Sequence, residues 1–355
     1  MPGELSDLTG NNIDLDKIKN FELFTKSSQF TGSLERAVTH HMVGLDTYKS
    51  NSRLLRHKQG HPKVFFTRPC INLSDSNMSS TRQTIDYKTN NDSIQHAVRR
   101  ILDPFLAERS PSPLVDNNMP FIVPLSNSCI KMTGWPDTVL PTYSSKEGIR
   151  REQLIIADGV IDDYGGFDIN AVFENIAGQP VKQIQALWLR SVSNEFENTF
   201  APYNTMLANN EIDYYTRIIV LVMDYTNTFV NEIASCVAFP TNFARGEALD
   251  VDKTKQINDS SEVTIRFKCF AAEYNDPILL NEFNQFVLMF NDDMYAMWKK
   301  EKNHNMEKIP KQFLHIFSNW AYPFINLDTK ELEWYVDKSK PYYSEIVKIL
   351  QRKVK

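Results

Sequence analysis

Residues 215–223 read Tyr-Thr-Arg-Ile-Ile-Val-Leu-Val-Met and carry the strongest β-strand signal in the chain. β-Branched and aromatic residues favour the pleated surface of a strand. Side chains alternate between the two faces of a strand, so this stretch would be apolar on both. The two faces consist of Ile218, Val220 and Val222, and of Ile219, Leu221 and Met223. The sequence therefore predicts a strand that is covered on both sides.

Two further strands are predicted around this one. Residues 225–228 read Tyr-Thr-Asn-Thr, which is typical of a turn, and residues 229–239 predict the returning strand of a hairpin. Residues 262–270 alternate between apolar and polar side chains. The residues expected to face the core are Val263, Ile265, Phe267 and Cys269, and those expected to face solvent are Thr264, Arg266 and Lys268. This third strand should have one solvent-exposed face.

Capping residues mark the starts of three helices. Ser93 can cap a helix that ends or kinks at Asp103-Pro104. Gly178-Gln179-Pro180 precedes a short helix that should lie on the sheet. Its buried stripe is Ile184, Leu187, Trp188 and Val192. Asp276-Pro277 begins the third helix, and residues 310–352 predict more helices, so the end of the chain is expected to be mainly helical.

Length and composition indicate a globular protein with several parts. The chain has 355 residues, of which 42 % are hydrophobic, enough to bury a substantial core. We expect an N-terminal arm and partly helical extension over residues 1–59, a β domain over 60–277, and a mainly helical appendix over 278–355. Residues 1–31 lack a core of their own and should order on a partner.

Charge is distributed unevenly along the chain. The formal net charge of −5 argues against wholesale nucleic-acid binding, which needs clustered Lys and Arg. Residues 299–355 carry twelve Lys and Arg against seven Asp and Glu, a net of +5, which leaves −10 on residues 1–298. This asymmetry could orient docking onto a neighbour, and solvated helix faces explain it equally well.

Catalytic and metal-binding motifs are missing. The sequence contains no GxGxxG, GxxxxGK[ST], GxSxG or HExxH, so we expect no catalytic, cofactor-binding or metal site. The richest carboxylate cluster consists of Asp158, Asp162, Asp163 and Asp168. Its spacing does not match an EF-hand loop, and Asp and Gly commonly form tight turns, so whether this loop binds a cation stays open. His57 and His61 are separated by Gly60 and predict a loop pair.

Cysteine usage and hydropathy indicate a reducing compartment. The four cysteines, Cys70, Cys129, Cys236 and Cys269, form no CxxC pair and are expected to be small buried thiols. No apolar stretch of about 18 residues and no signal-peptide pattern is present, so no membrane contact is expected. We expect synthesis and use, or assembly, in a reducing cytoplasm.

The order of the segments resembles a known fold. Residues 121–127 (Phe-Ile-Val-Pro-Leu-Ser-Asn) are followed by Gly134-Trp135-Pro136 and by the Gly-Gln-Pro helix with Ala186-Leu187-Trp188. The hairpin and the alternating strand then lead into Glu273-Tyr274-Asn275-Asp276-Pro277. This order resembles the tail-tube fold of contractile-tailed bacteriophages, in the versions found in baseplate hub and tube-initiator proteins. Residues 64–69 (Val-Phe-Phe-Thr-Arg-Pro) are similar to a segment of virion structural proteins of large phages. The resemblance covers at most residues 60–280.

This resemblance implies an α+β fold built on an antiparallel β-barrel or sandwich with a packed short helix. It also implies a homo-oligomer, a six-fold ring around a channel through which DNA passes without specific binding. The partners would be adjacent tail-tube or baseplate proteins in the virion. The candidate subunit interface is the doubly apolar strand, with one face on its own core and the other on a neighbour. Its residues are Ile218, Ile219, Val220, Leu221, Val222 and Met223.

Two departures from a plain tube subunit favour a specialised ring at the end of the tube. The chain is much longer than a minimal tube subunit, and the segment after Pro277 has no counterpart in a simple repeat. The baseplate end and the neck end both remain open. A receptor-binding protein or adhesin is an alternative, for which a trimer with an exposed aromatic patch would be expected. A cell-wall hydrolase would need a paired acid and base, and the sequence shows no such pair.

Overall fold

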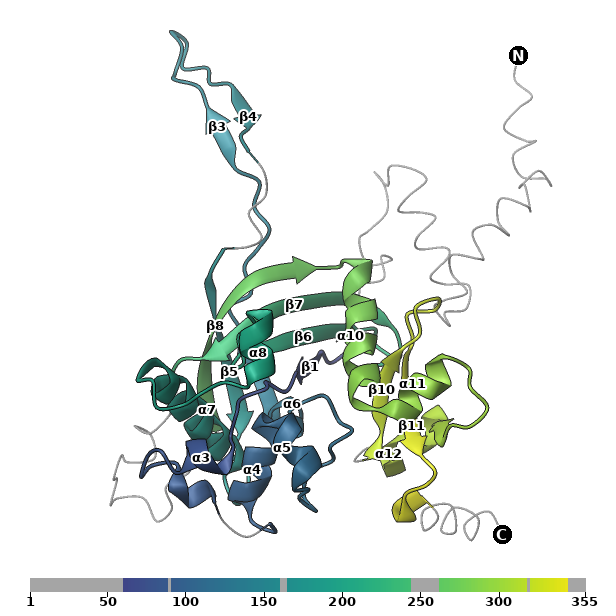
Figure 1. Cartoon of the computed structure of the whole chain (residues 1–355). Helices are drawn as coiled ribbons and strands as arrows, with labels where there is room; N and C mark the ends of the chain where they lie inside the picture. The colour runs from purple at the N-terminus through teal and green to yellow at the C-terminus, as the bar shows by residue number, and fades with distance from the viewer. Residues whose placement is uncertain (1–59, 89–90, 160–164, 244–261, 318–319, 344–355) are drawn as a thin grey trace, which may run out of the picture. The chain divides into compact units, whose positions relative to one another are not determined.

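The structure is a computed structural model that describes residues 60–343, apart from 89–90, 160–164, 244–261 and 318–319. The predicted N-terminal arm and the rest of residues 1–59 lie outside the described residues. From Gly60 onward the chain forms one compact unit. The described residues are built around a single curled antiparallel sheet (Figure 1).

This central sheet has six strands in the order β1-β6-β7-β8-β5-β2, and every neighbouring pair is antiparallel. The strands are β1 (Lys63–Phe66), β2 (Cys129–Thr133), β5 (Phe167–Glu174), β6 (Thr216–Met223), β7 (Val230–Pro240) and β8 (Glu262–Tyr274). Strands β1 and β2 form the two edges and do not pair with each other in the described part of the chain. The described residues combine helices with a curled antiparallel half-barrel sheet, which is compatible with the expected α+β fold of tail-tube type.

The predicted hairpin is present. Strands β6 and β7 pair from Thr216↔Ala238 to Met223↔Val230. In the turn, the Asp224 carboxylate accepts hydrogen bonds from the backbone N–H groups of Thr228 and Phe229, at 2.8 and 3.0 Å. Asn227 adopts a left-handed φ of 55°, which Asn tolerates better than most residues. The predicted turn chemistry therefore sets the register of the hairpin.

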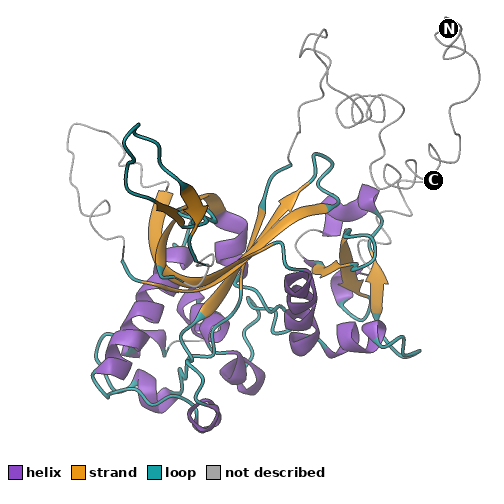
Figure 2. Cartoon of the chain, turned by 90° about the horizontal axis from the view of Figure 1, so that it is seen from above, coloured by secondary structure: helices purple, strands orange, loops and turns teal. Residues whose placement is uncertain are grey.

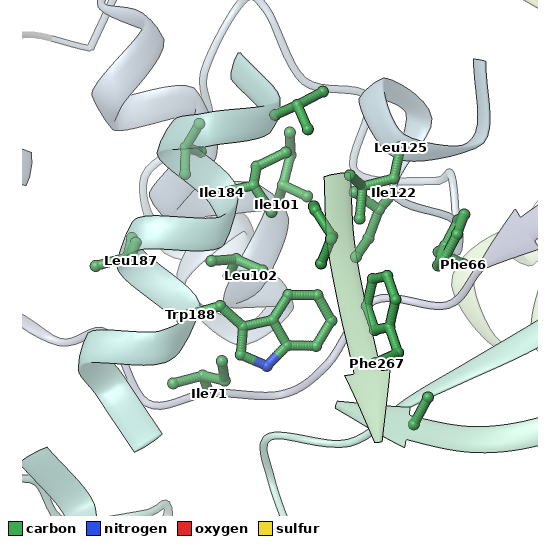
Figure 3. Close-up of a cluster of buried hydrophobic side chains, with 14 of the residues drawn as sticks. Phe66, Ile71, Ile101, Leu102, Ile122, Leu125, Ile184, Leu187, Trp188 and Phe267 are labelled. Atoms are coloured by element: carbon green, nitrogen blue, oxygen red, sulfur yellow. The ribbon is translucent and has the colours of Figure 1, made fainter. Parts of the chain in front are cut away.

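One face of the sheet is covered by helices. Helices α4 (Ile94–Leu102), α6 (Val123–Ser128) and α7 (Pro180–Phe196) contribute to the first hydrophobic cluster. Trp188 projects from α7 toward the strand that carries Phe267, and both side chains are 1 % exposed (Figure 3). The Trp188 indole N–H donates to the carbonyl oxygen of Tyr214, at 2.9 Å. The predicted inward residues of β8 all lie in this cluster, and Arg266 and Lys268 are exposed as expected.

The predicted helix caps are also present. The Ser93 side chain accepts a hydrogen bond from the backbone N–H of His96, and Asp276 does the same for Ile278 at the start of α10. Asp103 ends α4 as predicted and also caps α5 (Pro104–Arg109) by accepting from the backbone N–H of Leu106. Each cap satisfies an N–H group that has no partner within its helix.

The other face of β1 and β6 is covered by the C-terminal part of the chain. Helices α10 (Pro277–Phe290) and α11 (Asp292–Trp298) and a three-stranded sheet in the order β10-β11-β9 form the second hydrophobic cluster. Viewed from above, the central sheet lies between this group and the helices of the first cluster (Figure 2). The small sheet consists of β9 (Met306–Lys308), β10 (Tyr322–Ile325) and β11 (Leu332–Asp337).

The prediction of a mainly helical appendix is therefore wrong for the described residues after Trp298. The short stretches 322–325 and 332–337 form strands because they pair with each other and with the side chain of Asn284 on α10. The Asn284 side chain accepts from the backbone N–H of Ile325 at 2.8 Å and donates to its carbonyl oxygen at 2.7 Å. An amide side chain thus occupies the free edge of β10.

The remaining described elements lie outside the central and C-terminal sheets and the helices named above. They are α3 (Asp75–Met78), η3 (Ile85–Tyr87), β3 (Thr142–Ser144), β4 (Ile155–Ala157), α8 (Asn204–Asn209), η4 (Lys311–Phe313) and α12 (Leu314–Phe317). The buried Arg68 links three of the layers. Its guanidinium group donates to the carbonyl oxygens of Arg100 and Ile101 at the end of α4, at 2.6 and 2.9 Å. It also lies 5.5 Å from the Phe290 ring centroid of α10.

Replacing a core residue on either face of β6 should destabilise the subunit strongly. Ile218→Ala and Leu221→Ala should each lower the free energy of unfolding by ~2–5 kcal/mol, because each empties part of a closed core. Denaturant unfolding of the full chain, followed by circular dichroism, measures this. The control is Ile130→Ala on edge strand β2, where the side chain is 57 % exposed and the loss should stay below ~1 kcal/mol. Equal losses at Leu221 and Ile130 would contradict the second core.

Candidate assembly surfaces

Four of the six candidate interface residues on β6 are covered by the chain itself. Ile219, Leu221 and Met223 belong to the second cluster, and Ile218 belongs to the first; all four are at most 2 % exposed. Val220 and Val222 are half-buried. The structure confirms that both faces of the strand are covered, but the second cover comes from α10 and the C-terminal sheet. The interface on this strand stays a prediction, and Val220 and Val222 are the candidate residues that keep exposed surface.

A protruding arm carries a dense group of exposed apolar residues. Residues 137–158 leave the central sheet after β2 and form a separate two-stranded ribbon, β3 and β4, that stands away from the sheet (Figure 1). The register pairs Tyr143 with Ile156 and Ser144 with Ile155. The large apolar side chains that are at least half exposed in this arm are Val139, Leu140, Tyr143, Ile149, Leu154, Ile155 and Ile156. Both faces of the arm therefore present apolar surface to solvent.

The root of this arm is fixed to the sheet. The Trp135 ring lies 6.0 Å from the Tyr274 ring and 6.2 Å from the Phe167 ring. The Tyr274 hydroxyl donates to the carbonyl oxygen of Pro136, at 2.6 Å. Gly134 has a φ of 117°, and a Cβ atom at this position would lie 2.2 Å from the carbonyl oxygen of Asp168. Only glycine lets the chain leave β2 this close to β5.

Sequence patterns did not single out this arm. Its signal was present as two short apolar runs, Val139-Leu140 and Leu154-Ile155-Ile156, on either side of Gly148. Apolar runs around a glycine-containing loop are typical of a hairpin. The charged residues between the runs, such as Arg150 and Arg151, hid the pattern because they resemble an ordinary surface loop.

The second face of β5 and β8 forms a polar surface, and the second hydrophobic cluster, which covers β1, β6 and part of β7, contains no residue of β5 or β8. Asp168 and Lys268 are paired in register across the two strands, with a carboxylate to Nζ distance of 3.2 Å. Next to them, Arg266 Nε donates to the side-chain oxygen of Asn170, at 3.4 Å. This polar open face therefore carries two complementary cross-strand pairs, and further along the same strands Glu174 lies opposite Glu262.

Strand β2 borders this face as a free sheet edge. It pairs only with β5 among the described strands, and Ile130 and Lys131 are exposed on it. On the opposite edge, β1 is partly closed at Phe66, whose N–H donates to Ser126 Oγ and whose carbonyl oxygen accepts from Ile122. The β2 edge thus offers backbone groups that another strand can pair with.

The predicted carboxylate cluster is not assembled into a site in the described residues. Asp168 pairs with Lys268, and Asp162 and Asp163 lie outside the described residues. No group of three or more metal-ligating side chains occurs in the described ranges. All four cysteines are free thiols; Cys236 and Cys269 are buried, whereas Cys70 and Cys129 are half-buried. No described helix is long and apolar enough to cross a membrane.

Comparison with known protein families identifies the class of protein. The model of the family described as "Putative phage tail tube protein" matches residues 10–352. The chain belongs to this family. The match extends beyond residues 60–280, to which the sequence resemblance was limited, and includes the C-terminal sheet. No curated protein matches the chain.

Membership in this tail tube family has direct consequences. The protein is a structural component of a phage tail, it belongs to the virion, and it assembles with other tail proteins. The curled antiparallel sheet is compatible with a fold of tail-tube type. The exposed arm, the free β2 edge and the polar open face are therefore candidate surfaces for this assembly.

The arm should be the first part of the described chain that a protease cuts in the free subunit. Trypsin should cleave at Lys146, Arg150 or Arg151, because these residues lie in an exposed ribbon that packs on no core cluster. Mass spectrometry of the early fragments would locate the cut. Tail particles should resist cleavage at these positions. Initial cleavage inside β6 or β8 of the free subunit would contradict this description of the arm.

Proposed function

We propose that the protein forms a ring at the end of a phage tail tube, in which the apolar arm of each copy packs against a neighbouring copy or an adjacent tail protein. The observation that carries this proposal is the arm. Six subunits in a ring would enclose a channel that conducts DNA. The baseplate hub is the end that we favour, and the neck is the alternative.

The arm supports this proposal because its exposed surface is costly in isolation. A two-stranded ribbon is at best marginally stable in water, and Ile155 and Tyr143 remain 63 % and 54 % exposed in it. Burying such a surface gains about 25 cal/mol for each Å² of apolar area removed from water. The arm of residues 137–158 is therefore expected to pack against another molecule.

The sheet supplies the other contacts. Strand β2 can extend its ladder with a strand of a neighbour, because its outer edge has no partner strand among the described residues. The polar open face of β5 and β8 is then suited to line a channel. Lys268 on this face is paired with Asp168, and Glu174 lies opposite Glu262, so the face lacks the cluster of Lys and Arg that would hold DNA at one position.

A role at the end of the tube accounts for the C-terminal part of the chain. Residues 277–337 cover one face of β1 and β6 with two helices and three strands. We infer that this addition adapts the ring to baseplate or neck proteins, which a uniform stack of identical rings does not meet. We also propose that the protein is not an enzyme; specific loss of a catalytic activity on replacing Asp158 or Asp168 would contradict this.

A polar substitution within the arm tests the assembly role. The double variant Tyr143→Ser/Ile156→Ser changes one cross-strand pair on one face of the arm. Both side chains are at least half exposed, so the variant should unfold within ~1 kcal/mol of the wild type. Its self-association should weaken at least about tenfold, because a loss of ~1.4 kcal/mol in contact energy corresponds to that factor. Sedimentation velocity and negative-stain microscopy measure assembly.

The matched control for this double variant is Phe196→Ser/Met289→Ser, which changes two apolar residues outside the arm that are 75 % and 76 % exposed. The control should assemble like the wild type. Normal assembly of the arm variant, or equal loss in both variants, would show that the arm is not the contact.

The position of the protein in the virion tests the role at the tube end. A tag is added at the C-terminus. A tag at Gly148, in the loop between β3 and β4, is avoided because an antibody bound there would cover the arm. Gold-labelled antibodies should then mark one end of the tail. Labelling along the whole tube would show that the protein is the repeating tube subunit instead.

A further inference from the structure

A small internal cavity lies where four segments of the chain meet. It holds about 10 Å³, roughly the space of one water molecule. Ile71 and Asn72 line it from the segment after β1, Ser191 and Glu195 from α7, and Phe200, Ala201 and Pro202 from the connection to α8; the residues before β6 are Asp213 and Tyr214. The cavity therefore joins α7 to the segment that leads into the central strand.

Two carboxyl groups, those of Glu195 and Asp213, face this cavity, and none of its lining residues carries a positive charge. Asp213 is 6 % exposed. Burial, followed by the proximity of Glu195, raises the pKa of Asp213 to about 7, and burial also raises the pKa of Glu195. Two carboxylates that close together in a poorly solvated site cannot both ionise without cost.

The other titratable groups around Asp213 do not supply a counter-charge. Cys70, whose backbone N–H donates to the carbonyl oxygen of Asp213, has a thiol pKa raised to about 11 by burial and by Asp103. Glu211 and Tyr214 lie on the same segment as Asp213, and burial raises the pKa of Tyr214. A proton between Glu195 and Asp213 is thus the remaining way to neutralise the pair.

Asp213 also follows a segment, residues 203–212, whose side chains are poorly buried. Residues 203–212 contain α8, which buries none of its side chains, and Leu207 and Ile212 are 57 % and 47 % exposed. At the start of the segment, the Tyr203 hydroxyl donates to the carboxylate oxygens of the buried Asp103, at 2.8 and 2.9 Å. The segment is therefore held mainly at its two ends. A buried carboxyl group lies at each end, and at the second end the carbonyl oxygens of Asp213 and Tyr214 also accept from the Cys70 N–H and the Trp188 indole N–H.

We propose that Glu195 and Asp213 share one proton in the folded subunit, and that this proton is a pH-sensitive latch that holds the segment of residues 203–212 against α7. Loss of the proton leaves two carboxylates facing each other across the cavity, and the segment opens to let water reach them. The latch acts within one subunit and does not depend on ring formation.

The direction of the pH effect follows from proton linkage. The closed form binds the proton more tightly than the open form, in which Asp213 would titrate at an ordinary pKa near ~4. The latch is therefore fully effective at low pH and weakens as the pH rises toward and above ~7. Between pH ~6 and pH ~8.5 the ratio of open to closed segment should rise about tenfold, and it should level off at higher pH.

Hydrogen exchange of the full-length protein tests this latch. Protection factors for peptides covering residues 203–212, corrected for the intrinsic exchange rate at each pH, should fall about tenfold from pH ~6 to pH ~8.5. Asp213→Asn should remove this pH dependence, because the amide can donate a hydrogen bond to Glu195 at any pH. Glu195→Gln should behave in the same way and serves as the second variant if Asp213→Asn does not fold.

The matched control is Glu211→Gln, which removes a carboxylate from the exposed part of the same segment. It should retain the full pH dependence of the wild type. The latch is overturned if protection in the wild type is the same at both pH values, or if Asp213→Asn keeps the wild-type dependence. It is also overturned if millimolar Ca²⁺ restores protection at pH ~8.5, since the pair would then hold a cation rather than a proton.

Discussion

The burial of β6 on both faces is the constraint on which the rest of the subunit depends. Alternate residues of this strand enter two separate hydrophobic clusters, with Ile218 in the first and Leu221 in the second. The neighbouring β1 divides in the same way, with Phe66 in the first cluster and Phe65 in the second. A shift of one residue in this pairing would exchange every side chain between the two cores. The strands therefore fix the positions of the helices on both sides at once.

Polar contacts join the second core to the sheet at its margins. Arg217 on β6 forms ion pairs with Glu282 on α10 and with Glu273 on β8. Asn284, two residues further along the same helix, holds the edge of β10. Such contacts add little energy when they are exposed, but they specify one docking position because an unpaired partner would lose its hydrogen bonds. They explain how a short C-terminal sheet is held against α10.

This arrangement changes which surfaces are available for assembly. The chain itself buries Ile218, Ile219, Leu221 and Met223 of β6, and Val220 and Val222 of that strand remain half-buried. The apolar surface that remains exposed is concentrated in the ribbon of residues 137–158, whose root is fixed by Trp135 and Tyr274. The subunit thus combines a closed core with an exposed apolar ribbon outside it. Separating the two allows a subunit to fold before it assembles.

The sequence by itself determined the local elements whose signals are strong and short in range. The hairpin from β6 to β7, the alternation of β8 and the caps at Ser93 and Asp276 follow from side-chain period and from donors that a helix end leaves unpaired. It also pointed to the tail-tube class of protein through the order of these elements, and the family comparison agrees with this coarser identification. Ile218 and Leu221 are buried on opposite faces of β6, as the sequence predicts, whereas Val220 and Val222 are half-buried.

Only the tertiary structure decided what supplies that cover and where exposed apolar surface remains. The strands of residues 322–325 and 332–337 are too short to stand out in sequence, and they exist through pairing and the Asn284 amide. The arm was missed because a buried hairpin would have the same apolar runs. Its side chains are exposed because the chain leaves the sheet at Gly134 and Trp135. The pairing of Glu195 with Asp213 joins a residue of α7 to one that precedes β6, and their spacing in the sequence does not predict it. Long-range contacts of this kind depend on how the layers pack, which a local pattern does not contain.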